Sequence, residues 1–215
     1  MNKKVIYATF DTETLGGASH PEGVYNLGGL IHDREGNIFA SFNLIIAEHY
    51  NKILEKSYYG KSTFHRYQEM LESGNATMVA TEQEAIELVA NLLNLYNVKY
   101  IMAYNTDFDL RRTDCKILAE NRQFIDIYQM ATEIITPRPT YNKYCQANQF
   151  LTKNGNPQAK VETVYGYLTN NPQFVEEHTA FSDASQEMEI FLKCVKAHKS
   201  YTKNKHKNSD WAKWK

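Results

Sequence analysis

Short apolar runs alternate with polar turns over the first fifty residues, in the pattern of a β-meander. Residues 5–10 are mostly β-branched or aromatic, which is typical of a buried central strand. Residues 24–32 and 38–46 form two further runs, and the polar turn at residues 33–37 between them predicts a hairpin. We therefore expect three consecutive strands, antiparallel to one another.

Helical periodicity begins in the next segment. Residues 62–72 predict one short helix. Thr81 followed by Glu84 forms a capping box at the start of a second helix. Apolar side chains then recur at helical spacing, at Ile86, Val89, Leu93 and Tyr96.

Strands and helices alternate in the second half of the chain. Residues 99–104 predict a strand, 108–121 a helix and 124–127 a short buried strand. Short helices joined by loops are expected over residues 136–172, where proline and glycine recur. A last helix begins near Ser182 and presents one apolar face, made of Ala184, Met188, Phe191 and Val195. This order predicts a single α/β domain in which helices flank a mixed five-stranded sheet.

Composition places the chain among ordinary globular proteins. It has 215 residues, of which 42% are hydrophobic and 23% charged. No apolar run approaches the roughly 20 residues that span a bilayer, and we expect no signal peptide. The three cysteines, Cys115, Cys145 and Cys194, lack CxxC spacing, which argues against disulfides or structural zinc and fits a reducing cytosol.

Charge is divided unevenly along the chain. The formal net charge is −1, but residues 196–215 carry seven lysines against the single acid Asp210, so the rest of the chain is acidic. Both tryptophans, Trp211 and Trp214, lie in this segment. We expect a domain at residues 1–198 and a basic aromatic tail at 199–215. The tail has two interpretations: it grips a nucleic-acid strand, or it is a solubilising or protein-docking segment.

Two acidic residues separated by a single residue are the first candidates for a catalytic or metal-binding role. Asp11 and Glu13 lie in Phe-Asp-Thr-Glu-Thr at the end of the first predicted strand, and side chains at i and i+2 of a strand share a face. Both could reach one Mg²⁺ ion, which prefers oxygen ligands. The bare pattern is common, and we assign the similar pair Asp33 and Glu35 to a turn. An acid on a buried strand, however, costs free energy unless it meets a cation or a partner.

Two later segments carry further candidates. Asp109 lies in Asn-Thr-Asp-Phe-Asp at the start of a predicted helix, where the helix dipole alone could explain an acid. Of the seven histidines, only His178 has an aspartate, Asp183, five residues later. Histidine can accept a proton from water near neutral pH, whereas the alternative is a surface histidine before an ordinary helix start.

Taken in order, these residues resemble the DEDDh superfamily of 3′–5′ exonucleases. The matching segments are residues 10–14, 105–109 and 178–183, with weaker support from residues 124–127, and the resemblance covers about residues 4–197. The group includes the bacterial proofreading (epsilon-type, DnaQ-like) subunit and ribonuclease T. The resemblance implies a ribonuclease-H-like fold with a mixed sheet.

The resemblance also implies a mechanism and its residues. Two divalent cations, Mg²⁺ or Mn²⁺, would be held by Asp11, Glu13, Asp109 and Asp183, with His178 as general base. The chain would release nucleoside monophosphates from the 3′ end of mainly single-stranded DNA or RNA. Contacts with the terminal nucleotide would come from four residues: Thr14, Leu15, Asn105 and Phe108.

Three alternatives remain open at the level of sequence. The chain could be a non-catalytic nucleic-acid-binding module, an accessory subunit of a replication or repair complex with a polymerase partner, or a phosphodiesterase of very short oligonucleotides. DNA and RNA are not distinguished. The Lys-, Asn- and Tyr-rich composition suits the cytosol of a low-GC bacterium, or a phage-encoded protein.

Overall fold

A six-stranded sheet organises the computed structural model, which describes residues 4–17, 20–111, 114–119 and 121–198. The strand order is β4-β3-β2-β1-β5-β6. The tail predicted at residues 199–215 lies outside the described residues. The strands are β1 (Tyr7–Gly17), β2 (His20–His32), β3 (Ile38–Ile46), β4 (Thr77–Val79), β5 (Tyr100–Ala103) and β6 (Gln123–Asp126).

The sheet is mixed, as the sequence predicts. β1, β2 and β3 pair antiparallel in the expected meander, whereas β4, β5 and β6 each add in parallel. The predicted number of five strands is wrong because β4 was missed. β4 has only three residues, two of them exposed, so it leaves no apolar run in the sequence.

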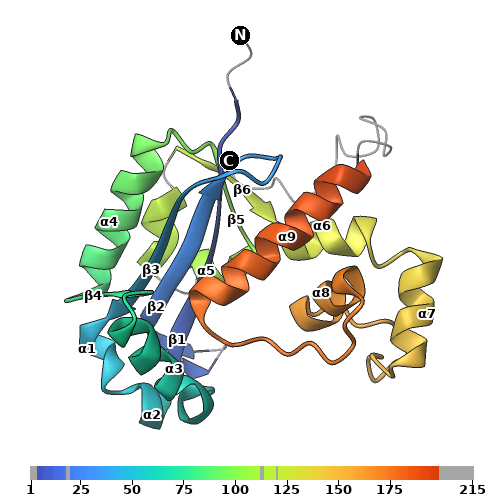
Figure 1. The fold of residues 1–215 in the computed structure, drawn as a ribbon, viewed down its shortest axis with the longest axis horizontal. Helices are drawn as coiled ribbons and strands as arrows, with labels where there is room; N and C mark the ends of the chain where they lie inside the picture. The colour runs from blue at the N-terminus through green and yellow to red at the C-terminus, as the bar shows by residue number, and fades with distance from the viewer. Residues whose placement is uncertain (1–3, 18–19, 112–113, 120, 199–215) are drawn as a thin grey trace.

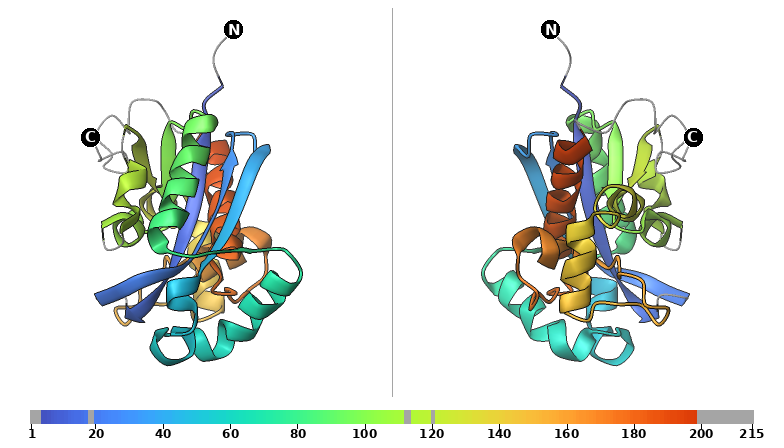
Figure 2. Two further views of the ribbon diagram at one scale, coloured as in Figure 1. Left: turned by 90° about the vertical axis from the view of Figure 1, so that its left-hand side faces the viewer. Right: turned by 90° about the vertical axis from the view of Figure 1, so that its right-hand side faces the viewer.

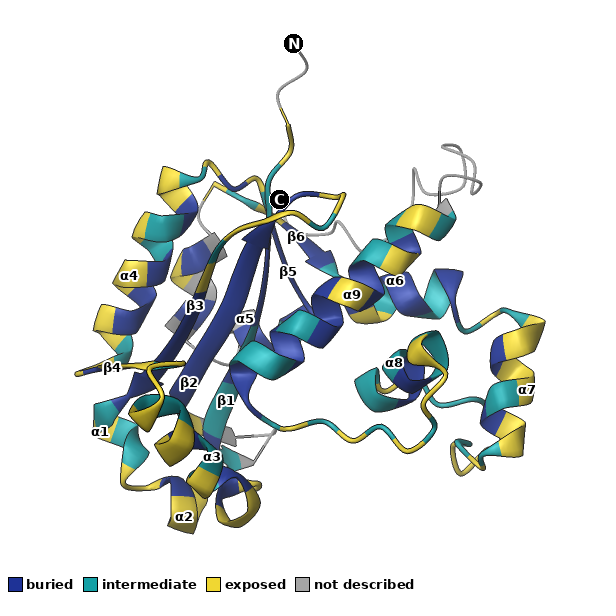
Figure 3. Ribbon diagram, viewed as in Figure 1, coloured by how far each residue is buried: buried dark blue, intermediate teal, exposed yellow. Residues whose placement is uncertain are grey.

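Helices cover both faces of the sheet. α4 (Glu82–Leu95) packs on one face and α9 (Ala180–His198) crosses the other, so the sheet lies between them (Figures 1 and 2). The predicted capping box is present in α4, where the Thr81 hydroxyl accepts a hydrogen bond from the Glu84 amide at 3.2 Å. Burial follows this layering, since the central strands and the sheet-facing side of α9 are buried (Figure 3).

Shorter helices surround the two ends of the sheet. α1 (Ala47–Tyr50), α2 (Ile53–Lys56) and α3 (Gly60–Glu72) form one group after β3. On the other side, α8 (Val161–Thr169) lies beside α9, and α7 (Pro139–Ala147) packs beyond α8 (Figure 1). α5 (Thr106–Arg111), a 3₁₀ helix (Asp114–Ala119) and α6 (Ile127–Ile134) flank β5 and β6. The single helix predicted over 108–121 is therefore a short α-helix and a separate 3₁₀ turn. In the described part of the chain no helix is both long and apolar enough to cross a membrane.

The alternation of side chains along β1 decides which residues face which helix. Ala8 and Phe10 join the core cluster beneath α4. Tyr7 points the other way and contacts Phe191 of α9, with ring centroids 5.2 Å apart. Because strand side chains alternate, Asp11 shares the face of Tyr7 and lies beneath the start of α9.

Candidate active site

The Asp11–Glu13 pair lies in the middle of a long strand rather than at its end. β1 continues to Gly17 because β2 pairs with it along its whole length, with a register shift just after Glu13. On its other edge, β5 pairs only from Tyr7 to Thr9. The two acids therefore lie where β1 runs on beyond its parallel neighbour, and this edge is open to other contacts.

Asp109 occupies that open edge. It lies in the first turn of α5, is 2% exposed, and accepts hydrogen bonds from the Thr12 amide at 3.2 Å and the Thr12 hydroxyl at 2.7 Å. An amide that would otherwise pair with a neighbouring strand is thus satisfied by the carboxylate. This contact ties the second acidic motif directly to the first.

Asp183 reaches the same place because α9 starts very close to β2. A Cβ on Gly28 would lie 2.2 Å from the Phe181 backbone nitrogen, so only glycine allows this approach. Next to it, Asn26 accepts a hydrogen bond from the Ala180 amide at 2.9 Å and anchors the first turn of α9. Gly28 pairs with Asp11 across the strands and Asn26 with Glu13, so the helix start lies over both acids.

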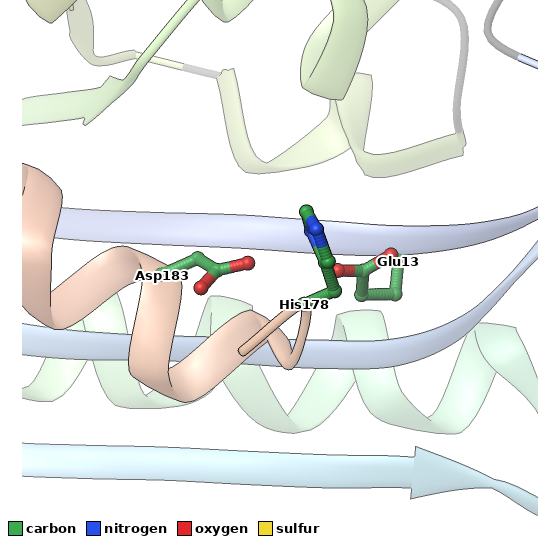
Figure 4. Close-up of side chains that lie close together, drawn as sticks. All are labelled: Glu13, His178 and Asp183. Carbon is green, nitrogen blue, oxygen red and sulfur yellow. The ribbon is translucent and has the colours of Figure 1, made fainter. Parts of the chain in front are cut away.

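His178 completes the group. Its backbone is left-handed, with φ of 53°, and its carbonyl accepts a hydrogen bond from the Tyr67 hydroxyl at 3.0 Å. Ligand atoms of Glu13, His178 and Asp183 all lie within 4.8 Å of one another. Figure 4 shows these three side chains together, Glu13 from β1 and Asp183 from the first turn of α9.

Burial and mutual repulsion raise the pKa values of the inner carboxyl groups. The pKa of Asp11 lies well above its ordinary value, first through burial and then through the charge of Asp109. Burial raises the pKa of Asp109 to about 7, although the two hydrogen bonds from Thr12 oppose the shift.

Glu13 and Asp183 behave in the same way. Burial, followed by the charge of Glu176, raises the pKa of Glu13 to about 8 and that of Asp183 to about 9. His178 shifts in the opposite direction, since burial lowers its pKa and favours the neutral ring. The inner carboxyl groups therefore retain protons near neutral pH unless a cation replaces them, and they lie beside a neutral imidazole.

The donor set fits a divalent cation. Asp183 is only 6% exposed, and its Oδ1 has no hydrogen-bond partner within the described residues. A buried carboxylate oxygen without a donor is costly, and a hard cation satisfies it. The acidic cluster can thus hold a metal ion, and the sequence-predicted residues Asp11, Glu13, Asp109, His178 and Asp183 come together at one place.

Two clefts open at this cluster. The larger measures about 900 Å³ and includes His178 and the predicted substrate residue Asn105 in its wall. The smaller measures about 550 Å³ and is lined by Glu13 together with the predicted substrate residues Thr14 and Phe108. Leu15 differs: its side chain is 1% exposed and packs in the core, so it does not face a ligand.

Several neighbouring residues were missed at the level of sequence. Tyr59 stacks on the His178 ring, with centroids 3.6 Å apart and planes 9° from parallel, and it borders both clefts. No spacing in the sequence connects residues so far apart. Glu162 and Glu176 form a second acidic group around His178. Glu187 lies one helical turn after Asp183, and this spacing in the sequence could have indicated that Glu187 lies near the site.

Comparison with solved structures identifies the architecture. Cell-death related nuclease 4 matches 89% of this chain and 64% of its own length, with a TM-score of 0.57 and 14% identity. The chain has the fold of these nucleases. E. coli Exonuclease I in complex with a dT13 oligonucleotide matches 92% of the chain with a TM-score of 0.54 and 12% identity. Exonuclease I from Methylocaldum szegediense matches 87% of the chain with a TM-score of 0.55 and 16% identity.

The match extends over only part of these neighbours. The chain spans 64% of the length of the first and 42% and 40% of the two Exonuclease I chains. No protein-family model matches the chain, and no curated protein matches its sequence. The ribonuclease-H-like exonuclease fold implied by the sequence resemblance is thereby confirmed at the level of the fold.

Proposed function

We propose that this chain is a metal-dependent 3′–5′ exonuclease that releases nucleoside monophosphates from single-stranded DNA or RNA. The observation that carries the proposal is the convergence of four carboxylates and one neutral imidazole at the junction of two clefts. The solved neighbours are nucleases, and one of them binds a single-stranded oligonucleotide. A role in DNA replication or repair extends this hypothesis and rests on the sequence resemblance alone.

The carboxylates would hold two divalent cations. Asp11, Glu13 and Asp183 would bind one Mg²⁺ or Mn²⁺ ion, and Asp11 with Asp109 would bind a second. Bound in this way, such ions would lower the pKa of a water molecule and neutralise charge on the phosphate. Asp109 is already oriented for this role by Thr12, which fixes one of its oxygens.

His178 supplies the base. Its lowered pKa keeps the ring neutral, so a ring nitrogen can accept the proton of the attacking water. The water oxygen bonds to phosphorus while the bond from phosphorus to the 3′-oxygen breaks, and a nucleoside 5′-monophosphate leaves. The charge of the nearby Glu162 favours the protonated ring that forms.

Each cleft would bind a different part of the substrate. The smaller cleft, with Thr14 and Phe108, suits the terminal nucleotide, because an aromatic ring can stack on any base. The larger cleft suits the preceding strand, since Lys153 and Lys160 can meet its phosphates and Tyr104 and Tyr128 its bases.

Digestion of 5′-labelled single strands of DNA and RNA tests the proposal. The wild-type chain should produce a ladder with Mg²⁺ or Mn²⁺ and none with EDTA. Asp183→Asn should abolish the ladder, because it removes a carboxylate from the cation site while keeping its shape. Absence of a ladder on both polymers, or a ladder that survives EDTA, would refute the proposed function.

A further inference from the structure

One carboxylate in the cluster has no place in the mechanism above. Glu187 lies on α9 one helical turn beyond Asp183, so the two side chains share a face of the helix. Glu187 is 3% exposed; its carboxylate accepts a hydrogen bond from the Tyr104 backbone amide, but its Oε2 has no hydrogen-bond partner within the described residues. A glutamate this deeply buried is rare without a compensating partner.

The surroundings of Glu187 identify which partner it needs. The charged groups that act on it most strongly are Asp109, Asp183 and Glu176, all acids like itself. Glu187 in turn is the second-strongest charged neighbour of Asp11, after Asp109. The charges that act most strongly on Glu187 are therefore all negative, and its own charge acts mainly on the Asp11–Asp109 part of the cluster.

A buried carboxylate among acids can be compensated in two ways. A bound proton makes it neutral, in which case it acts as an ordinary polar core residue. A hard divalent cation compensates it while leaving it charged, as oxygen donors do in magnesium and manganese sites. The geometry allows the second case, because the Tyr104 backbone amide hydrogen-bonds to the carboxylate while its Oε2 has no donor within the described residues, which leaves that oxygen available to a cation.

We propose that Glu187 is a fifth carboxylate of the cation site, on the side of Asp11 and Asp109. The inference rests on the proposed function, since it adds a residue to the same site. Glu187 increases the affinity of this side for Mg²⁺ or Mn²⁺, whether it contacts the ion or orients the carboxylates that do.

Titration of the full-length, metal-free protein with Mn²⁺, followed by the electron paramagnetic resonance of the free ion, tests the proposal. Glu187→Gln should weaken Mn²⁺ binding by about 10-fold or more, as removal of outer ligands does at other metal sites. Glu189→Gln, an exposed glutamate on the same helix, serves as the matched control and should bind like wild type.

Asp183→Asn separates failure of this inference from failure of the function. If it weakens binding while Glu187→Gln binds like wild type, Glu187 is a neutral core residue and the inference is wrong. If neither variant changes Mn²⁺ binding, the cation site itself is wrong and the inference falls with it.

A second variant guards against misfolding. Glu187→Met has similar length, removes the buried charge and should leave the metal-free protein at least as stable as wild type. In thermal melts at an Mn²⁺ concentration near the wild-type Kd, it should lose most of the Mn²⁺-induced rise in melting temperature. An undiminished rise in this variant would also overturn the proposal.

Discussion

His178 is held by contacts that its own sequence neighbourhood does not supply. Its ring is stacked on Tyr59 and its carbonyl is fixed by Tyr67. The left-handed backbone turns the imidazole toward Glu13 and Asp183, and burial keeps it neutral. These contacts explain how a residue before a helix can be positioned well enough to act as a base.

Replacement of His178 by alanine should lower turnover without loss of the cation. We expect kcat to fall by about 10²–10⁴-fold, the usual contribution of a general base. Mn²⁺ affinity should change little, because the carboxylates remain. Single-turnover rates and metal titrations measure the two effects, and an unchanged kcat would remove His178 from the mechanism.

Tyr59 should matter through its ring rather than its hydroxyl. Tyr59→Ala should lower kcat by about 10-fold, because the imidazole loses the surface that orients it, whereas Tyr59→Phe keeps the stack and should retain activity. Tyr58 is 82% exposed and borders the same small cleft, so Tyr58→Ala is the matched control. An equal loss in both alanine variants would indicate a shared substrate contact instead.

The sequence predicts the five motif residues at this scale and little around them. Asp11, Asp109 and Asp183 each lie in a short motif that can be recognised in the sequence alone. Tyr59 does not, because it reaches His178 from a segment more than a hundred residues earlier and no local pattern records that contact. Leu15 shows another limit of a motif, since its side chain packs in the core and any nucleotide contact would come from its backbone.

The start of α9 against β2 is the element-scale contact on which the site depends. Gly28→Ala should push the helix away from the strand, lower the free energy of unfolding by about 2 kcal/mol and weaken Mn²⁺ binding by moving Asp183. Gly29→Ala makes a somewhat looser clash on the opposite face of the sheet, with its Cβ 2.5 Å from the Phe42 ring and 2.7 Å from the Thr9 carbonyl. It should destabilise the protein without altering metal affinity, and equal affinities for the two variants would contradict the proposed role of this contact.

Helices and strands are predictable from the sequence where local residues, such as a polar turn or a helix cap, mark their ends. The meander has a polar turn, in which the Asp33 carboxylate accepts the amides of Glu35 and Asn37, and α4 has its Thr81 cap. α6 was missed because it begins directly after β6, where Asp126 ends the strand and caps the helix at once. β1 was predicted too short because its outer half is defined by pairing with β2, which is a tertiary interaction.

At the scale of the whole molecule, the acidic cluster makes stability depend on pH. Carboxyl groups in the unfolded chain titrate near pH 4. In the folded protein the pKa is about 7 for Asp109, about 8 for Glu13 and about 9 for Asp183. Between about pH 4 and pH 9 the folded state therefore binds more protons than the unfolded state, so its stability falls as pH rises.

Thermal melts across this range test that relation. The metal-free protein should melt at progressively lower temperature from pH 5 to pH 8, and saturating Mn²⁺ should flatten the decline, because bound cations replace the protons. Asp183→Asn should show a smaller decline without metal. A melting temperature that rises with pH in the metal-free wild-type protein would contradict this picture of the cluster.

The central claim concerns the direction and metal dependence of cleavage, and one reaction tests both. A single-stranded oligonucleotide carrying one label at its 5′ end and another at its 3′ nucleotide is incubated with the protein and Mn²⁺. We predict that the 3′ label is released first, as a mononucleotide, while the 5′ label shortens stepwise, and that EDTA stops both. Release of the 5′ label first, or no metal-dependent release of either label, would contradict the account.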